Sequence, residues 1–100
     1  MRALLIDPES RQIQEVNVAT RDDIVRLVGF DTLESDAVGD QGDRLFFDEE
    51  CFLRQSSGRF QLDTLVPVAG RGVVIGVADD GSYRDAIISR QDLGQRTRYL

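Results

Sequence analysis

The most apolar part of the chain lies between residues 66 and 88. Within it, residues 73–78 read Val-Val-Ile-Gly-Val-Ala, and β-branched residues of this kind lose little side-chain freedom when the backbone is extended. A strand with one face in water alternates apolar and polar residues, whereas this run is apolar throughout. We therefore expect residues 73–77 to form the central strand of a sheet that is covered on both faces.

A tight turn follows this strand. Asp79, Asp80, Gly81 and Ser82 separate it from a second run of strand-forming residues, 83–88. An Asp-Gly pair between two such runs is a strong hairpin signal, because glycine adopts the positive φ that tight hairpin turns require. The pattern predicts an antiparallel hairpin whose second strand spans residues 83–88.

The N-terminal part of the chain predicts another hairpin. Residues 2–6 form a short apolar strand, and residues 7–10 have the composition of a turn, because proline presets φ and short polar side chains bond to nearby backbone. Residues 12–18 then alternate imperfectly, as expected for a return strand with one face in solvent. Ile13 is out of phase with the later apolar residues, which allows a bulge near Glu15.

A short helix is predicted at residues 20–29. Thr20 can cap the free N–H groups of the first turn, and Asp23, three residues later, completes a capping box. Gly29 supplies the stop. The apolar residues of this segment share one helical face: Ile24, Leu27 and Val28.

The middle of the chain alternates short apolar runs with polar turns. We expect strands at residues 32–38, 44–47 and 51–53, with turns at residues 39–43 and 48–50.

The last segment, residues 89–100, begins in the same way as the first helix. Ser89 and Asp92 stand at capping-box spacing, and Gly94 weakens the helix that they start. Together these elements predict a single α+β domain over residues 1–100. Its core is a mainly antiparallel sheet of five or six strands, with one or two short helices covering one face.

Composition and charge exclude several classes of protein. A chain of 100 residues can bury a core without a disulfide or a metal. Its first apolar run is too short for a signal peptide or a membrane span, so we expect a cytoplasmic protein that does not bind membranes. The net charge of -6 argues against direct binding of nucleic acid, which needs clustered Lys and Arg.

Negative charge is concentrated between residues 31 and 50. This segment contains one base, Arg44, and eight acids: Asp31, Glu34, Asp36, Asp40, Asp43, Asp48, Glu49 and Glu50. Clustered like charges repel one another, so folding alone does not favour them. We interpret the segment as a surface that steers a basic protein partner. The candidate interaction residues are Asp36, Asp40, Asp43, Asp48, Glu49 and Glu50.

Two other interpretations of these acids stay open. They can form a solvated rim on hairpin turns, or they can coordinate Ca²⁺ or Mg²⁺ through their carboxylate oxygens. Their spacing does not follow that of a calcium loop, in which alternate positions and a glycine shape the cage. No metal ligands are therefore assigned.

Catalytic chemistry finds little support in the sequence. The chain contains no histidine, which removes the commonest general base and the Ser-His and Cys-His nucleophile pairs. Its single cysteine, Cys51, lies between Glu50 and Phe52, with no adjacent cation to activate the thiol. We interpret it as a small buried apolar residue and predict a protein that is not an enzyme and has no cofactor.

Glycines before the central strand raise the question of a phosphate site. Gly70, Gly72 and Gly76 do not match the dinucleotide fingerprint, because they enter a strand where that motif would open a helix. A bulge or a close approach of strands also explains them. Arg71, between the first two glycines, is the candidate anion-binding residue.

Three segments give the chain a resemblance to a known family. They are residues 2–8 (Arg-Ala-Leu-Leu-Ile-Asp-Pro), residues 43–50 (Asp-Arg-Leu-Phe-Phe-Asp-Glu-Glu), and residues 70–77 with the following Asp-Asp-Gly-Ser-Tyr. In order and spacing they resemble a family of small domains of unknown function from phages, plasmids and bacterial genomes. The resemblance implies a mobile-element or accessory-gene context and brings no known activity.

These observations favour a non-catalytic protein-interaction or accessory module with a basic protein partner. The alternative is a domain that binds a small ligand or a divalent ion through its acidic turns. A third interpretation is an enzyme subunit whose site needs a partner to be complete. The sequence carries no signal for a particular oligomeric state.

Overall fold

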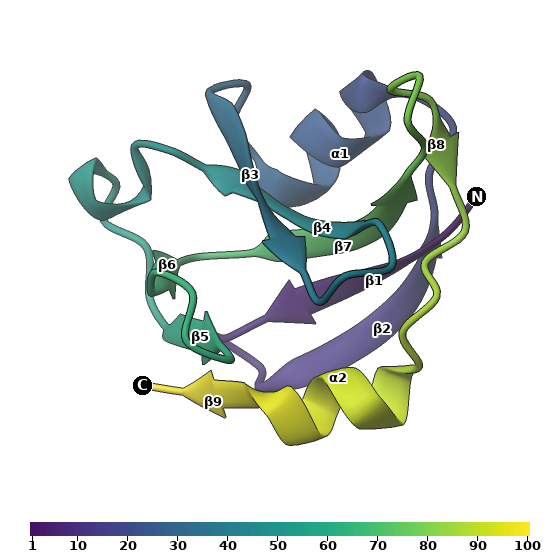
Figure 1. The fold of residues 1–100 in the computed structure, drawn as a ribbon. Coiled ribbons are helices and arrows are strands. Elements are labelled where there is room, and N and C mark those ends of the chain that lie inside the picture. Colours follow the sequence, from purple (N-terminus) through teal and green to yellow (C-terminus); the bar gives the residue numbers. More distant parts are fainter.

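A six-stranded antiparallel sheet forms the centre of the molecule, in a computed structural model that describes residues 1–100 (Figure 1). The strand order is β2-β1-β7-β4-β3, and β8 pairs with β7. Its strands are β1 (Arg2–Asp7), β2 (Gln12–Asn17), β3 (Leu33–Val38), β4 (Asp43–Asp48), β7 (Gly72–Val77) and β8 (Tyr83–Arg84). The predicted α+β class with a mainly antiparallel sheet is confirmed.

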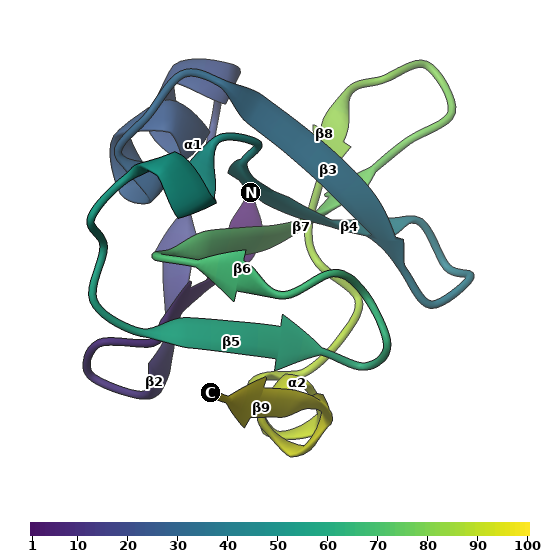
Figure 2. The same ribbon diagram turned by 90° about the vertical axis from the view of Figure 1, so that its left-hand side faces the viewer.

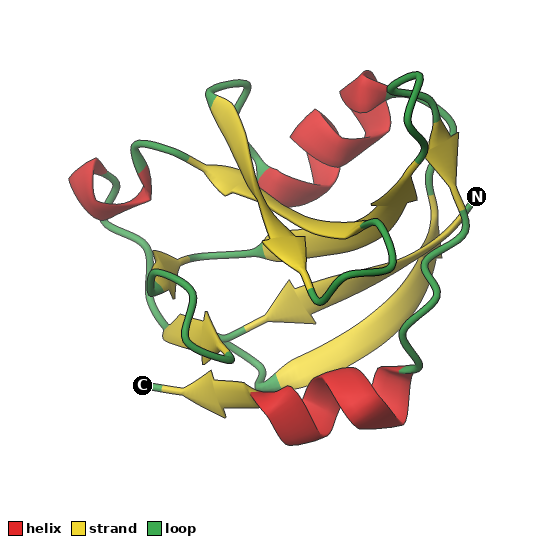
Figure 3. Cartoon of the chain, viewed as in Figure 1, coloured by secondary structure: helices red, strands yellow, loops and turns green.

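A second, smaller sheet was not anticipated from the sequence. It has three strands in the order β6-β5-β9, which are β5 (Arg59–Leu62), β6 (Val68–Ala69) and β9 (Thr97–Tyr99). Figure 2 shows it in front of the large sheet. The helices are α1 (Arg21–Val28), the 3₁₀ turn η1 (Cys51–Leu53) and α2 (Arg90–Arg96) (Figure 3). None of them combines the length and the apolar character that crossing a membrane requires.

The predicted central strand, β7, has the position expected of it. It lies between β1 and β4, and Val73, Val74 and Ile75 are completely buried. Gly72 at its start marks a close approach, because a Cβ there would lie 2.8 Å from side-chain atoms of both Leu45 and Phe60. Strand packing, and not a phosphate site, therefore accounts for this glycine.

The two faces of the large sheet are covered by different elements. Because side chains alternate along a strand, β7 sends Val73 and Ile75 to one face and Val74 to the other. The first face packs under α1, in a core of Ala3, Leu5, Val18, Ile24, Val28, Val73 and Ile75. The second packs against the small sheet and α2, through residues that include Leu4, Ile6, Leu45, Phe47, Phe60, Leu62, Val74 and Leu93. The helices thus lie on opposite faces, and not together on one face as predicted.

Helix α1 begins and ends as the sequence predicts. The Asp23 carboxylate accepts the backbone N–H groups of Ala19, at 2.8 Å, and Thr20, at 3.1 Å. These two bonds lower the pKa of Asp23. Gly29 closes the helix with φ of 99°, in the left-handed region where glycine is favoured.

The second strand has no bulge near Glu15, although its apolar pattern allowed one. β1 and β2 pair without interruption from Arg2 opposite Asn17 to Asp7 opposite Gln12. Ile13 and Val16 differ in phase because β2 contributes to both cores: Ile13 packs with the small-sheet core and Val16 with the α1 core.

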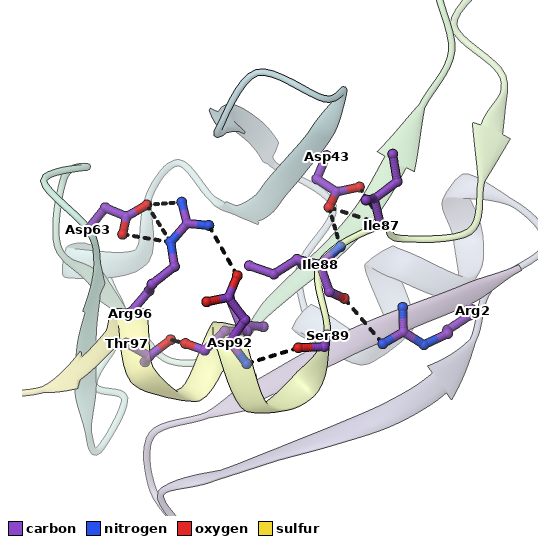
Figure 4. Close-up of polar contacts among 10 residues, drawn as sticks. Arg2, Asp43, Asp63, Ile87, Ile88, Ser89, Asp92, Arg96 and Thr97 are labelled. Carbon is purple, nitrogen blue, oxygen red and sulfur yellow. Dashed lines mark hydrogen bonds and ion pairs between the residues drawn. The ribbon is translucent and has the colours of Figure 1, made fainter.

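The strand predicted at residues 83–88 is shorter than expected. Only Tyr83 and Arg84 pair with β7, after the predicted turn. Beyond them, the Ala86 N–H still donates to the Arg2 carbonyl at 2.9 Å, and side chains supply the other bonds to this segment. The Asp43 carboxylate accepts the N–H groups of Ile87 and Ile88, and the Arg2 guanidinium donates to the Ile88 carbonyl oxygen at 3.2 Å (Figure 4). The same guanidinium donates to the Ala86 carbonyl oxygen at 2.7 Å.

Residues 51–53 form the 3₁₀ turn η1, and not the predicted return strand. The Leu53 N–H donates to the Glu50 carbonyl at 2.9 Å, and the Glu50 N–H donates to the Asp48 carboxylate at 3.0 Å. These local bonds turn the chain immediately after β4.

The terminal helix is confirmed over Arg90–Arg96, with Ser89 accepting the Asp92 N–H at 3.0 Å. The chain then leaves the helix at Thr97, whose hydroxyl donates to the Leu93 carbonyl at 2.7 Å (Figure 4). Its last residues pair with β5 as β9, which places the C-terminus in the small sheet.

Candidate functional site

The six acids predicted to form one interaction surface fall into different environments. Asp43 and Asp48 are strand residues of β4 and are buried, each 3% exposed. Asp40, Glu49 and Glu50 are exposed, and Asp36 is half-buried. The structure brings Asp36 and Glu49 together in one groove, while Asp40 lies in the turn between β3 and β4.

Asp43 holds the chain together and does not belong to the exposed surface. Its carboxylate accepts the Ile87 N–H at 3.0 and 3.1 Å and the Ile88 N–H at 2.9 Å (Figure 4). The Arg84 guanidinium lies 3.6 Å away and balances its charge. The prediction that Asp43 is a turn residue offered to a partner is therefore wrong, because its oxygens are occupied inside the protein.

Asp48 has a similar structural role. Its carboxylate accepts bonds from the Thr32 hydroxyl, from the Glu50 N–H at 3.0 Å and from Arg54 Nε at 3.0 Å. Burial alone would raise the pKa of Asp48, but these three donors outweigh burial and lower it. Asp48 is also withdrawn from the predicted interaction surface.

A groove of about 260 Å³ lies beside the first half of β3. It is lined by Glu34, Asp36, Phe47, Glu49, Cys51, Phe52, Val66 and Pro67, and is called the acidic groove below. Glu34 stands opposite Phe47 and Asp36 opposite Leu45 in the β3–β4 ladder, so both acids share the face of the sheet that packs against the small sheet. Strand alternation thus places their side chains together on one side of β3.

The three acids of the groove have no partner within the protein. Glu34, Asp36 and Glu49 make no side-chain hydrogen bond or ion pair. Arg54 bonds to Asp48 instead, and Arg44 bonds to Ser35 on the other face of the sheet. None of these three carboxylates is therefore neutralised by an ion pair within the protein.

Apolar side chains are exposed next to these acids. Phe52 is 54% exposed, Leu53 79% and Val66 56%. The Arg59 guanidinium lies 5.1 Å from the centre of the Phe52 ring and covers part of it. Large apolar side chains grouped at the surface commonly mark binding sites.

The two remaining predicted acids lie apart from the groove lining. Asp40 lines three clefts, of about 380, 330 and 510 Å³, around the β3–β4 turn. Glu50 lies 3.5 Å from the guanidinium of Arg54. Both carboxylates are exposed, so they add to the negative field of this side without forming part of one site.

Arg71 has a local role in the structure. Its guanidinium donates to the Leu27 carbonyl, at 3.5 Å, near the C-terminal end of α1 where a cation is favourable. The cavity of about 370 Å³ beside it is also lined by Asp7 and Glu9, whose charges oppose binding of an anion. Anion binding by Arg71 stays a prediction.

The protein offers neither a cluster of metal ligands nor an exposed thiol. No three His, Cys, Asp or Glu side chains are grouped so that they could hold a metal ion. Cys51 is buried, and its Sγ accepts the Ala69 N–H at 3.4 Å.

Sequence reasoning missed part of the groove. Glu34 belonged to the acidic segment but was not among the candidate residues, although its spacing of two from Asp36 on a predicted strand places both on one face. Val66 and Pro67 approach the groove from a loop far along the chain, and no local pattern could have indicated this. Comparisons with protein-family models, with curated proteins and with solved structures found no match for this chain.

Proposed function

We propose that this protein is a non-catalytic interaction module that binds a basic protein partner through the acidic groove. The observation that carries the proposal is the set of three unpaired carboxylates, of Glu34, Asp36 and Glu49, beside the exposed side chains of Phe52 and Val66. No internal ion pair has to be broken before these acids meet a cation. The groove therefore suits Arg or Lys side chains whose stems pack on apolar surface.

Charge and apolar surface contribute differently to such binding. The carboxylates steer the approach of a basic partner and raise the association rate, an effect that salt screens over about 10 Å at 0.1 M. Phe52 and Val66 offer area that is removed from water when the partner is in place, which slows dissociation. The proposal thus predicts an association rate that depends on salt and a dissociation rate that depends on the apolar residues.

The non-catalytic part of the proposal follows from the chemistry of the groove. General bases and activated nucleophiles draw most often on histidine, which the chain lacks. The thiol of Cys51 is buried and occupied by the Ala69 N–H. The resemblance to small phage and plasmid domains adds an accessory role in the cytoplasm to this proposal.

The experiment compares two charge-neutralised variants of the protein. The groove variant carries Glu34→Gln, Asp36→Asn and Glu49→Gln. The control carries Asp22→Asn, Asp79→Asn and Asp92→Asn, which make the same change in net charge at exposed positions elsewhere. Partners are recovered with the unaltered protein by affinity purification, and their association rates are measured by surface plasmon resonance at low and high salt.

The groove variant should associate about tenfold more slowly than the control at low salt, and the difference should shrink as salt rises. Circular dichroism should show both variants folded, because the groove acids have no internal partner and the control removes only the exposed ion pair of Asp92 with Arg96, at 3.8 Å, of a kind that contributes little to stability. Equal association rates for the two variants would contradict the proposal.

A further inference from the structure

β3 is an open edge of the large sheet. It ends the strand order and pairs with β4 alone (Figure 2). The strand at the opposite edge, β2, has α2 alongside it, with Ile13 close to Gly94 (Figure 1). β3 makes its extensive contacts with β4 only. An unprotected edge strand presents backbone groups to which another strand can bond.

The register shows which backbone groups face outward. The Glu49 N–H donates to the Thr32 carbonyl at 2.9 Å, so Thr32 directs its bonding groups toward β4. Alternation along the antiparallel ladder gives Glu34, Asp36 and Val38 the same direction. The N–H and C=O groups of Leu33, Ser35 and Ala37 therefore point away from the sheet.

One of these outward groups already has a partner. The Arg44 guanidinium donates to the Ser35 carbonyl at 2.9 Å and to the Ser35 hydroxyl at 2.8 Å. No backbone bond outside the helices and strands involves Leu33, Ser35 or Ala37. Their three N–H groups and the carbonyl oxygens of Leu33 and Ala37 are thus left for water or for an added strand.

We propose that the edge of β3 takes up an extended segment of the partner protein as an additional strand, whose Arg or Lys side chains lie over Glu34 and Asp36. This inference rests on the proposed function, because it names the conformation and chemistry of the partner at the acidic groove. Adjacent strands lie about 4.8 Å apart, and side chains directly opposite one another share a face. A basic residue opposite Glu34 or Asp36 therefore points to the groove side and reaches the carboxylate.

In such a complex, backbone hydrogen bonds contribute affinity and side chains contribute specificity. The outward groups of β3 bond to any extended segment, whatever its sequence. The choice of segment comes from its alternate residues, which meet Glu34 and Asp36 on one face. A partner segment with basic residues at every second position fits both requirements.

Charge argues against a second copy of this chain at the same edge. Two β3 strands paired antiparallel would set Glu34 and Asp36 of one copy against those of the other on one face. Like charges directly opposite one another destabilise a strand pair, and each chain carries a net charge of -6. The edge is therefore complementary to a basic segment and not to itself.

The test uses a capped synthetic peptide of alternating Arg and Val and two N-methylated versions of it. One version is methylated on every Val amide and the other on every Arg amide. Because the N–H groups of alternate residues point to opposite edges of an extended peptide, each version loses the N–H donors of one edge only. Fluorescence anisotropy measures their binding to the full chain. In strand addition, one version should bind at least about tenfold more weakly than the parent while the other keeps its affinity.

Amide hydrogen exchange followed by NMR locates the added strand. Peptide binding should slow exchange at Leu33, Ser35 and Ala37. Equal affinity of both methylated peptides, or no binding of the parent peptide, would overturn strand addition. Slow exchange of these amides in concentrated protein without peptide would show that a second copy occupies the edge, which also overturns it.

A variant separates this inference from the proposed function. With Glu34→Gln and Asp36→Asn, the parent peptide should lose affinity while the backbone edge is unchanged. If both methylated peptides bind equally well and the variant still loses affinity, the acidic groove binds basic segments but not as a strand. If the variant and the unaltered protein bind all peptides equally, the proposed function fails as well.

Discussion

The Asp43 carboxylate accepts the backbone N–H of Ile88 at 2.9 Å, although the two residues are 45 positions apart in the chain. The same carboxylate accepts the N–H of Ile87, and Arg84 lies 3.6 Å away. One side chain of β4 thereby holds the segment that leads from β8 to α2. This explains why the backbone ladder can end at Arg84 without leaving these N–H groups unsatisfied.

Asp43→Ala should lower the free energy of unfolding by roughly 3 kcal/mol, because it leaves the buried N–H of Ile88 and the partly buried N–H of Ile87 without an acceptor, at about 1–3 kcal/mol for each buried group. The control is Asp40→Ala at the exposed neighbouring turn, which should cost less than about 0.5 kcal/mol. Urea unfolding of both variants measures the difference. Similar losses would mean that Asp43 does not hold this segment.

Local signals in the sequence accounted for the central strand and the first helix. The uniformly apolar run of β7 is buried from water only when both faces of the sheet are covered. Helix α1 begins after Thr20, which is extended, and ends at Gly29, which is in the left-handed region. The prediction of a strand over residues 83–88 failed beyond Arg84, where side chains supply most of the bonds to the backbone. Arg2 and Asp43, far away in sequence, bond the backbone around Ile87 and Ile88, so a segment with strand-like composition does not join the sheet.

The site was less predictable than the fold, because acid content does not distinguish exposed from bonded carboxylates. Asp48 and Glu49 are adjacent in sequence, yet the first is buried among three donors and the second is exposed in the acidic groove. Which of the two carboxylates faces water depends on the alternation of side chains along β4 and on the hydrogen bond that Arg54 donates to Asp48. Val66, which lines the groove, reaches it from a loop that is distant in the sequence.

Ile75→Ala tests the central strand. Ile75 is completely buried in β7 under α1, so truncation removes apolar contact and leaves a cavity, at a cost of roughly 2–5 kcal/mol. Ile87→Ala is the matched control, because Ile87 is 54% exposed. Denaturant unfolding should separate the two variants clearly. A loss below about 1 kcal/mol for Ile75→Ala would contradict the central position of β7.

Asp48 should make stability depend on pH in the acid range. Its pKa is lowered in the folded protein, so the charged form is stabilised by folding. This contribution is complete above the pKa of the unfolded chain, about 3.9, and is lost as pH falls through the lower pKa of the folded state. The difference in unfolding free energy between the unaltered protein and Asp48→Asn should therefore shrink below about pH 4. Urea titrations from neutral to acid pH measure it, and a constant difference would contradict the assignment.

Divalent ions should have little effect on the melting temperature of the isolated protein. No three acids, those of the acidic groove included, are placed so that they could hold a metal ion together, and the two buried carboxylates of β4 already have protein donors. Thermal unfolding with chelator and with low millimolar Ca²⁺ or Mg²⁺ measures this. A large upward shift with either ion would favour the alternative of an ion-binding domain, since binding to the folded state stabilises it.

Arg44 should regulate access to the β3 edge, because its guanidinium occupies the Ser35 carbonyl that an added strand would use. Arg44→Met frees this carbonyl and completes the row of outward groups. The control, Arg90→Met, makes the same change in net charge at an exposed residue of α2. The alternating Arg-Val peptide should bind more tightly to Arg44→Met than to Arg90→Met, because only the first gains a backbone acceptor. Fluorescence anisotropy of the two variants measures this, with circular dichroism to confirm that both are folded. Equal affinities would mean that the Ser35 carbonyl takes no part in binding and that Arg44 serves only to order β3 against β4.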